Sequence, residues 1–175
     1  TSTASQAVDV TPAAATRLAI TTPASTVAGA PMLFTVAALD AYNNMGAVSD
    51  AQSDYNEAIK WYMKVLHVRG QDKNVRALLN AAFDYEALGS YAKAEEFLQK
   101  VRTIRPDDDD VLTFLGDNLY FQHKFKPAIK VYQEAVKINP KNRYAWRGLG
   151  FSLAQDDRPE DAVDALEHSK AIKAD

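Results

Sequence analysis

The feature that most constrains this chain is a repeat of 34 residues in its C-terminal part. Residues 90–107 (SYAKAEEFLQKVRTIRPD) and 124–141 (KFKPAIKVYQEAVKINPK) align without a gap. Ala94 falls on Ala128, and the same offset leads to Ala162. Apolar residues recur at helical spacing, so each copy is predicted to be two amphipathic helices. Such a unit buries its apolar faces only by stacking on its neighbours.

Small and helix-breaking residues recur in register. We expect small side chains to let the paired helices approach closely, namely those of Gly116, Gly150, Ala94, Ala128 and Ala162. Pro106 and Pro140 should end the second helix of their copies, because proline has no N–H to continue it. The run Asp107–Asp110 precedes a first helix and lacks the glycine and glutamate of an EF-hand loop. It is therefore predicted to cap that helix rather than to bind calcium.

The order of residue types resembles the tetratricopeptide repeat: a large residue, Leu-Gly, then Ala, an aromatic residue, Ala and Pro. It is carried by Leu112, Leu115 and Gly116 in one copy and by Trp146, Leu149 and Gly150 in the next. A first copy fits through Tyr42, Met45, Gly46, Ala58 and Tyr62, with about two extra residues before the second. The resemblance implies an all-α solenoid over residues 39–175. The four copies would be residues 39–74, 75–108, 109–142 and 143–175.

The N-terminal part has a different composition, rich in Ser, Thr, Ala and Pro and almost uncharged. Residues 16–21 (TRLAIT) and 32–39 (MLFTVAAL) alternate as β-strands do. Residues 16–44 resemble the first strands of an immunoglobulin-like repeat of bacterial surface proteins. We therefore expect residues 1–38 to form a β-rich or extended arm, with the join to the helices between residues 38 and 44. The resemblance favours an extracellular or periplasmic location over a cytoplasmic one.

The composition excludes several classes of function. Net charge is −3, with 25% charged residues, so the chain has no electrostatic footprint for nucleic acid. No apolar run approaches the roughly 20 residues that span a bilayer. There is no cysteine, which excludes thiolate chemistry and thiolate metal sites.

No catalytic signature is present either. The sequence contains no Ser-His-Asp set, no Walker loop and no glycine-rich dinucleotide fingerprint. His67, His123 and His168 lie in different copies without a partner at ligand spacing, and solvated surface positions suit them better than a metal site. We expect a non-enzymatic protein without catalytic residues, metal or cofactor.

The resemblance implies that the first helix of each copy lines a concave groove. The residues that the repeat register places there as candidate partner-binding residues are Asn43, Arg76, Asn80, Phe83, Phe114, Asp117, Tyr120, Tyr144, Arg147 and Phe151. The same register adds Ala47, Asp50, Leu79, Glu86, Asp110, Thr113, Phe121 and Gln155. An aromatic lining with a few charges suits an extended peptide or a helix. About half of these rings are expected to pack between repeats instead.

One specific function of the family can be weighed by residue. Tetratricopeptide domains that clamp the carboxylate tails of heat-shock chaperones use Lys and Asn in the first copy, Asn in the second, and Lys and Arg in the third. The corresponding first-copy residues here are Asn43 and Ala47, and the third-copy residues are Asp110 and Phe114. Asn80 alone matches, so such a clamp is not expected.

Two main hypotheses follow. The first is a protein-interaction scaffold that holds a peptide or partner protein in its groove. The alternative is a structural subunit of an extracellular filament or homopolymer, in which the edges of the N-terminal strand pair engage the neighbouring subunit. The sequence ends with the fourth copy, leaving Val163 and Ile172 without a following repeat, and this favours head-to-tail association. A third and weaker hypothesis is an accessory domain of an enzyme.

Overall fold

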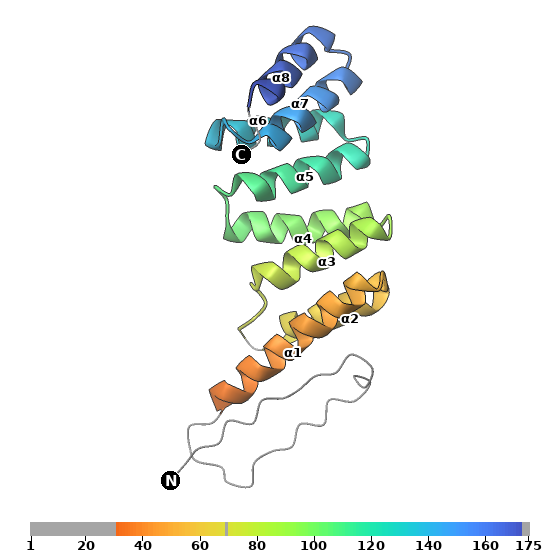
Figure 1. The fold of residues 1–175 in the computed structure, drawn as a ribbon, viewed down its shortest axis with the longest axis vertical. Coiled ribbons are helices and arrows are strands. Elements are labelled where there is room, and N and C mark those ends of the chain that lie inside the picture. Colours follow the sequence, from red (N-terminus) through yellow and green to blue (C-terminus); the bar gives the residue numbers. More distant parts are fainter. Residues whose placement is uncertain (1–30, 69, 173–175) are drawn as a thin grey trace.

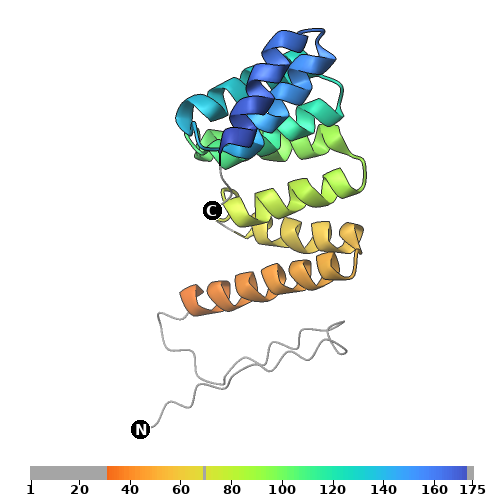
Figure 2. The same ribbon diagram turned by 45° about the horizontal axis from the view of Figure 1, so that its top comes forward.

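The protein is a stack of α-helices in the computed structural model, which describes residues 31–68 and 70–172. The helices are α1 (Pro31–Ala51), α2 (Tyr55–His67), α3 (Val75–Ala87), α4 (Tyr91–Ile104), α5 (Asp109–Phe121), α6 (Phe125–Ile138), α7 (Arg143–Gln155) and α8 (Pro159–Ala171). They follow one another along a rod from α1 to α8 (Figures 1 and 2). The described residues contain no strand, so the all-α prediction is confirmed for that part of the chain.

The helices pack as sequential pairs, and small residues make the pairs close. A Cβ atom added at Gly116 would lie 2.6 Å from the ring of Tyr132, and one at Gly150 would lie 2.6 Å from Leu166 Cγ. The alanines expected at these contacts, Ala94, Ala128 and Ala162, are all buried. The prediction that small residues set the approach of the paired helices is therefore confirmed.

Polar side chains cap the helices that open the copies. Asp108 Oδ1 accepts from the backbone N–H of Val111 at 3.2 Å, so the acidic run caps α5 as predicted. Asn142 does the same for α7, where its Oδ1 accepts from Tyr144 and Ala145. Asn142 also donates to Asp109 Oδ2 at 2.7 Å, which ties the start of α7 to the start of α5.

Both prolines act as predicted. α4 ends at Ile104 and α6 ends at Ile138, each two residues before its proline. Proline is common at this distance beyond a helix because it cannot continue the hydrogen-bond ladder.

The strand expected over residues 32–39 is wrong. α1 begins at Pro31 and runs without interruption to Ala51, so the proposed join between residues 38 and 44 lies inside a helix. A short apolar run fits a buried helix as well as a strand, and proline is favourable at the first helical position. The other expected strand, residues 16–21, lies outside the described residues, as does the rest of the arm to residue 30.

None of the helices in the described ranges has the length and apolar character needed to cross a membrane.

Candidate partner-binding groove

The groove is built on contacts between first helices of successive copies. α5 and α7 pack against each other although α6 separates them in the sequence. Helices that meet in this way lie on the inner side of the stack. The register of residues along α5 and α7 then decides which side chains face the groove.

An open pocket of about 450 Å³ lies between α5 and α7. Its lining residues are Asp117, Tyr120, Phe121, Tyr132, Arg147, Gly148 and Phe151. Phe121 and Phe151 are exposed by 56% and 47%, large fractions for phenylalanine, so their rings are available to a partner. Four of the ten candidate groove residues are therefore brought together: Asp117, Tyr120, Arg147 and Phe151.

The floor of the pocket is the ring of Tyr132, which is almost fully buried. It fills the space that two glycines leave open, since a Cβ added at Gly116 or at Gly148 would collide with it. The ring from α6 thus lies against both α5 and α7. A larger residue at either glycine would push the ring out of place.

The polar end of the pocket is made by Asp117 and Arg147. Tyr132 donates a hydrogen bond from its hydroxyl to Asp117 Oδ1 at 2.5 Å. Burial raises the pKa of Asp117, while the hydrogen bond from Tyr132 and the charge of Arg147 oppose the rise. Burial, together with the negative charge of Asp117, raises the pKa of Tyr132, so the hydroxyl stays protonated and remains a donor.

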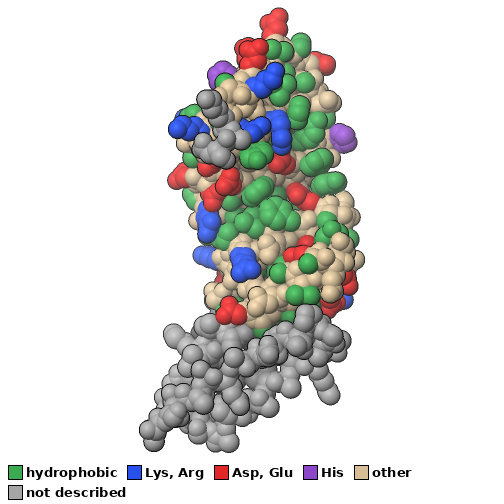
Figure 3. All heavy atoms as spheres, in the orientation of Figure 1, with side chains coloured by type: hydrophobic (Ala, Val, Ile, Leu, Met, Phe, Trp, Pro, Cys, Tyr) green, Lys and Arg blue, Asp and Glu red, His purple; other side chains and the backbone are tan. Residues whose placement is uncertain are grey.

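A second aromatic cluster lies further along the groove. Phe83 and Phe114 meet edge to face with ring centroids 5.0 Å apart. Phe83 is 37% exposed, whereas Phe114 is half-buried against the core. Figure 3 shows hydrophobic side chains gathered near the middle of one face of the rod, at the level of α3, with charged groups around them.

Tyr144 lies at the start of α7 and is 58% exposed. The guanidinium groups of Arg143 and Arg147 lie 5.9 and 5.3 Å from its ring centroid. This arrangement leaves a cationic and aromatic rim beside the pocket.

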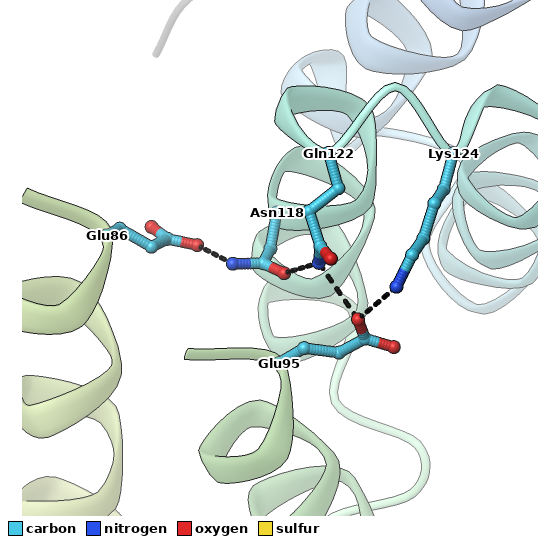
Figure 4. A network of polar contacts seen from close by, with 5 residues as sticks. All are labelled: Glu86, Glu95, Asn118, Gln122 and Lys124. Atoms are coloured by element: carbon cyan, nitrogen blue, oxygen red, sulfur yellow. Dashed lines mark hydrogen bonds and ion pairs between the residues drawn. The ribbon is translucent and has the colours of Figure 1, made fainter. Parts of the chain in front are cut away.

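A polar network fixes the second copy against the third (Figure 4). Asn118 donates to Glu86 at 2.7 Å, and Gln122 donates to both Asn118 and Glu95. Lys124 donates to the same oxygen of Glu95 at 2.8 Å. Burial would raise the pKa of Glu95, but the bonds from Lys124 and Gln122 lower it overall. The network holds the two walls of the groove at a fixed spacing.

The remaining candidates lie in the first two copies. Asn43 is buried and donates to Leu39 O within its own helix, so its side chain does not line an open groove. Asn80 is half-buried, and its side chain opposes the rise in the pKa of Tyr62. Arg76 is exposed. None of these three joins the pocket between α5 and α7.

Two pocket residues, Tyr132 and Gly148, are absent from the sequence-based set. Tyr132 belongs to the second helix of its copy, which the register assigns to the core, yet its hydroxyl reaches the groove. Gly148 precedes the Leu-Gly pair that the repeat pattern uses. A pairing of tyrosine with a non-pattern glycine is the signal that could have indicated them.

Comparison with known proteins agrees with this geometry. Tetratricopeptide repeat profiles match residues 36–107, 74–141 and 115–174. The peroxisomal targeting signal receptor of Candida glabrata is 30% identical over 121 residues, which cover 59% of this chain and 20% of the receptor. Protein ycf37 of Cyanophora paradoxa is 29% identical over 112 residues, covering 63% of this chain and 65% of that protein. The chain thus spans about a fifth of the receptor's length.

Solved structures of MamA share the fold. A MamA crystal structure superposes with a TM-score of 0.68 at 26% identity over 74% of each chain. MamA from Desulfovibrio magneticus RS-1 superposes with a TM-score of 0.70 at 21% identity, covering 77% of this chain and 75% of that one. The profile matches extend over more than half of the sequence, and the chain belongs to the tetratricopeptide repeat family.

Proposed function

We propose that this chain is a non-enzymatic scaffold that binds a segment of a partner protein along its groove. The pocket between α5 and α7 would hold an apolar side chain of that segment. The observation that carries the proposal is the combination of exposed Phe121 and Phe151 with the polar pair Asp117 and Arg147 around one opening. Aromatic anchors beside a few placed polar groups are typical of peptide-binding grooves.

Family and relatives support the same function. The peroxisomal receptors are named for recognition of a targeting signal, and their similarity lies in the repeats. The Phe83–Phe114 pair would contact a neighbouring part of the bound segment, because the repeat register places Phe83 34 residues before Asp117 and Phe114 34 residues before Gly148, both of which line the pocket.

The test is selection from a phage-displayed library of random linear peptides, followed by affinity measurements on the enriched peptides. Phe151→Ala and Arg147→Ala should each weaken binding about tenfold or more, as anchor residues do. Ile138→Ala is the matched control, since Ile138 is 42% exposed but lies at the end of α6, outside the pocket. Equal affinities for all three variants, or an empty selection, would contradict the proposal.

The filament alternative loses one of its two premises. It required an edge strand over residues 32–39, which is instead the first part of α1. The extracellular or periplasmic location stays a prediction, since it depends on the resemblance of residues 16–44, most of which lie outside the described residues.

A further inference from the structure

Two carboxyl groups meet between the first and second copies. Asp50 lies in the last turn of α1, and Asp84 lies in α3. Asp84 is only 4% exposed, which is unusual for an aspartate without a cation beside it. Among the described residues, Asp50 Oδ1 and Asp84 Oδ2 are buried oxygens with no donor assigned to them when both groups are ionised.

The other contacts of Asp50 show which group holds the charge. Tyr62 donates from its hydroxyl to Asp50 Oδ2 at 2.5 Å, so Asp50 is stabilised as a carboxylate. Asp84 Oδ2 is buried without a hydrogen-bond partner, as is Asp50 Oδ1, and the charge of Asp50 is one cause of the raised pKa of Asp84. A proton on Asp84 would satisfy both unpartnered oxygens at once.

We propose that Asp50 and Asp84 share one proton across the boundary between the first two copies, and that its loss loosens the first copy from the second. In the protonated state, Asp84 Oδ2 donates to Asp50 Oδ1. In the deprotonated state, two negative charges lie side by side in a buried place, and separation or hydration of the helices relieves the repulsion.

The local titration agrees with this geometry. Burial, the hydrogen bond with Asp50 and the negative charge of Asp50 together raise the pKa of Asp84 to about 8. A raised pKa in the folded state means that the stabilising contribution is complete below the ordinary pKa of aspartate. It is lost as the pH rises through about 8.

Other charged groups of the surrounding helices are directed elsewhere. From α2, the titratable group at the pair is Tyr62, whose pKa is raised by burial and by its bond to Asp50. From α4, Lys93 lies over the ring of Tyr85 and Glu95 binds Lys124. No cation is among the causes of the raised pKa of Asp84.

The adjacent copy supplies a natural comparison. Asn118 occupies the position 34 residues after Asp84 and is fully buried. Its amide nitrogen donates to Glu86 at 2.7 Å, the kind of bond that a protonated Asp84 would make to Asp50. Asp84→Asn is therefore an isosteric substitution that the repeat already tolerates one copy later.

The first experiment compares thermal unfolding of wild type and Asp84→Asn from about pH 5.5 to pH 8.5, a range that ends above the raised pKa. The wild-type Tm should fall relative to the variant by about 3 °C or more over this range, a shift typical of such a chain length. Asp72→Asn, an exposed change in the loop before α3, is the control and should follow wild type. Parallel curves for wild type and Asp84→Asn would overturn the proposal.

A second measurement locates the change and does not depend on the stability of a variant. The chain has two tryptophans, Trp61 in the first copy and Trp146 in the fourth. With Trp146→Phe as background, Trp61 emission should shift to the red between pH 6 and about pH 9, with a midpoint near the pKa of about 8. With Trp61→Phe as background, the emission of Trp146 should stay constant.

Infrared spectroscopy of the otherwise unmodified chain gives the direct readout. The carbonyl band of a protonated carboxylic acid should be present at pH 6 and should disappear with the same midpoint. It should be absent from Asp84→Asn. Absence of the band from wild type at pH 6 would show that no proton is shared, whatever the groove binds.

Discussion

Two tyrosines at matching places in the solenoid have different surroundings. Tyr62 in α2 and Tyr132 in α6 are both buried, both lie against a glycine of the preceding helix, and both donate to an aspartate at 2.5 Å. The two sites differ in the first helix of the next copy. In α3 the residue near Tyr62 is Asn80, whereas in α7 the residue against Tyr132 is Gly148.

The consequence is a closed cluster at one end of the rod and an open pocket at the other. Around Tyr62, Asn80 and a buried second carboxyl, Asp84, complete a polar interior. Around Tyr132, the missing side chain of Gly148 leaves room for the buried ring beneath the open pocket, and Arg147 balances the charge of Asp117. One substitution in a repeat can thus turn a closed internal contact into an open pocket.

Removal of the rings tests the shared part of the comparison and should have the largest effect. Tyr62→Ala and Tyr132→Ala should each lower the free energy of unfolding by about 3–5 kcal/mol, since each leaves a cavity in place of a buried aromatic ring. The loss should be greater for Tyr132, which lies against glycines of two helices. Chemical denaturation measures both values, and a smaller loss at Tyr132 would break the comparison.

Replacement of Gly148, the residue that distinguishes the two sites, should have the next largest effect on stability. Gly148→Asn places in α7 the residue type that α3 carries at the same position. The new side chain collides with Tyr132 and should cost about 1–3 kcal/mol of stability, even though glycine is a poor helix former. It should also abolish binding of selected peptides. Retention of full affinity by a folded Gly148→Asn variant would separate the pocket from the function.

Removal of the hydroxyl groups alone should have a smaller effect. Tyr132→Phe and Tyr62→Phe keep the rings but remove the hydroxyl that donates to Asp117 or to Asp50, at a cost of about 1–2 kcal/mol each. Denaturant midpoints measured at neutral pH give the difference from wild type. A gain of stability in either variant would show that the hydroxyl is an unfavourable buried group rather than a stabilising donor.

The smallest effect concerns pH dependence at the open end. Burial raises the pKa of Asp117, while the hydrogen bond from Tyr132 and the charge of Arg147 oppose this increase in pKa. The stability that Asp117 contributes is therefore lost as the pH rises through its raised pKa. We expect the Tm of Asp117→Asn to stay parallel to that of wild type above neutral pH, in contrast to Asp84→Asn. A relative gain of Asp117→Asn at alkaline pH would remove this difference between the two ends.

Much of the fold could be predicted because its determinants recur. Gly116, Gly150 and the alanines at helix contacts repeat every 34 residues, and each repetition adds an independent indication of the same packing. The region before residue 39 has no second copy to compare with. There, the alternation in residues 32–39 favours a strand, whereas the structure has a helix that begins at Pro31.

The candidate site was predicted in part. Side chains of the first helices, such as Arg147 and Phe151, follow from the register of the repeat. Tyr132 did not follow, because a second-helix residue reaches the groove only where both neighbouring helices lack a side chain. Asn43 was predicted to line the groove and does not. Its position in the repeat fits the groove, but its side-chain amide donates a hydrogen bond to Leu39 O within α1.

The sequence alone determined that the chain is a stack of paired helices, because periodic apolar residues and recurring small residues leave few other ways to bury its surface. Only the tertiary structure decided where that stack opens and where it closes. The physical reason is that a pocket depends on the side chain opposite each buried ring. That partner, Gly148 for Tyr132 and Asn80 for Tyr62, comes from another copy.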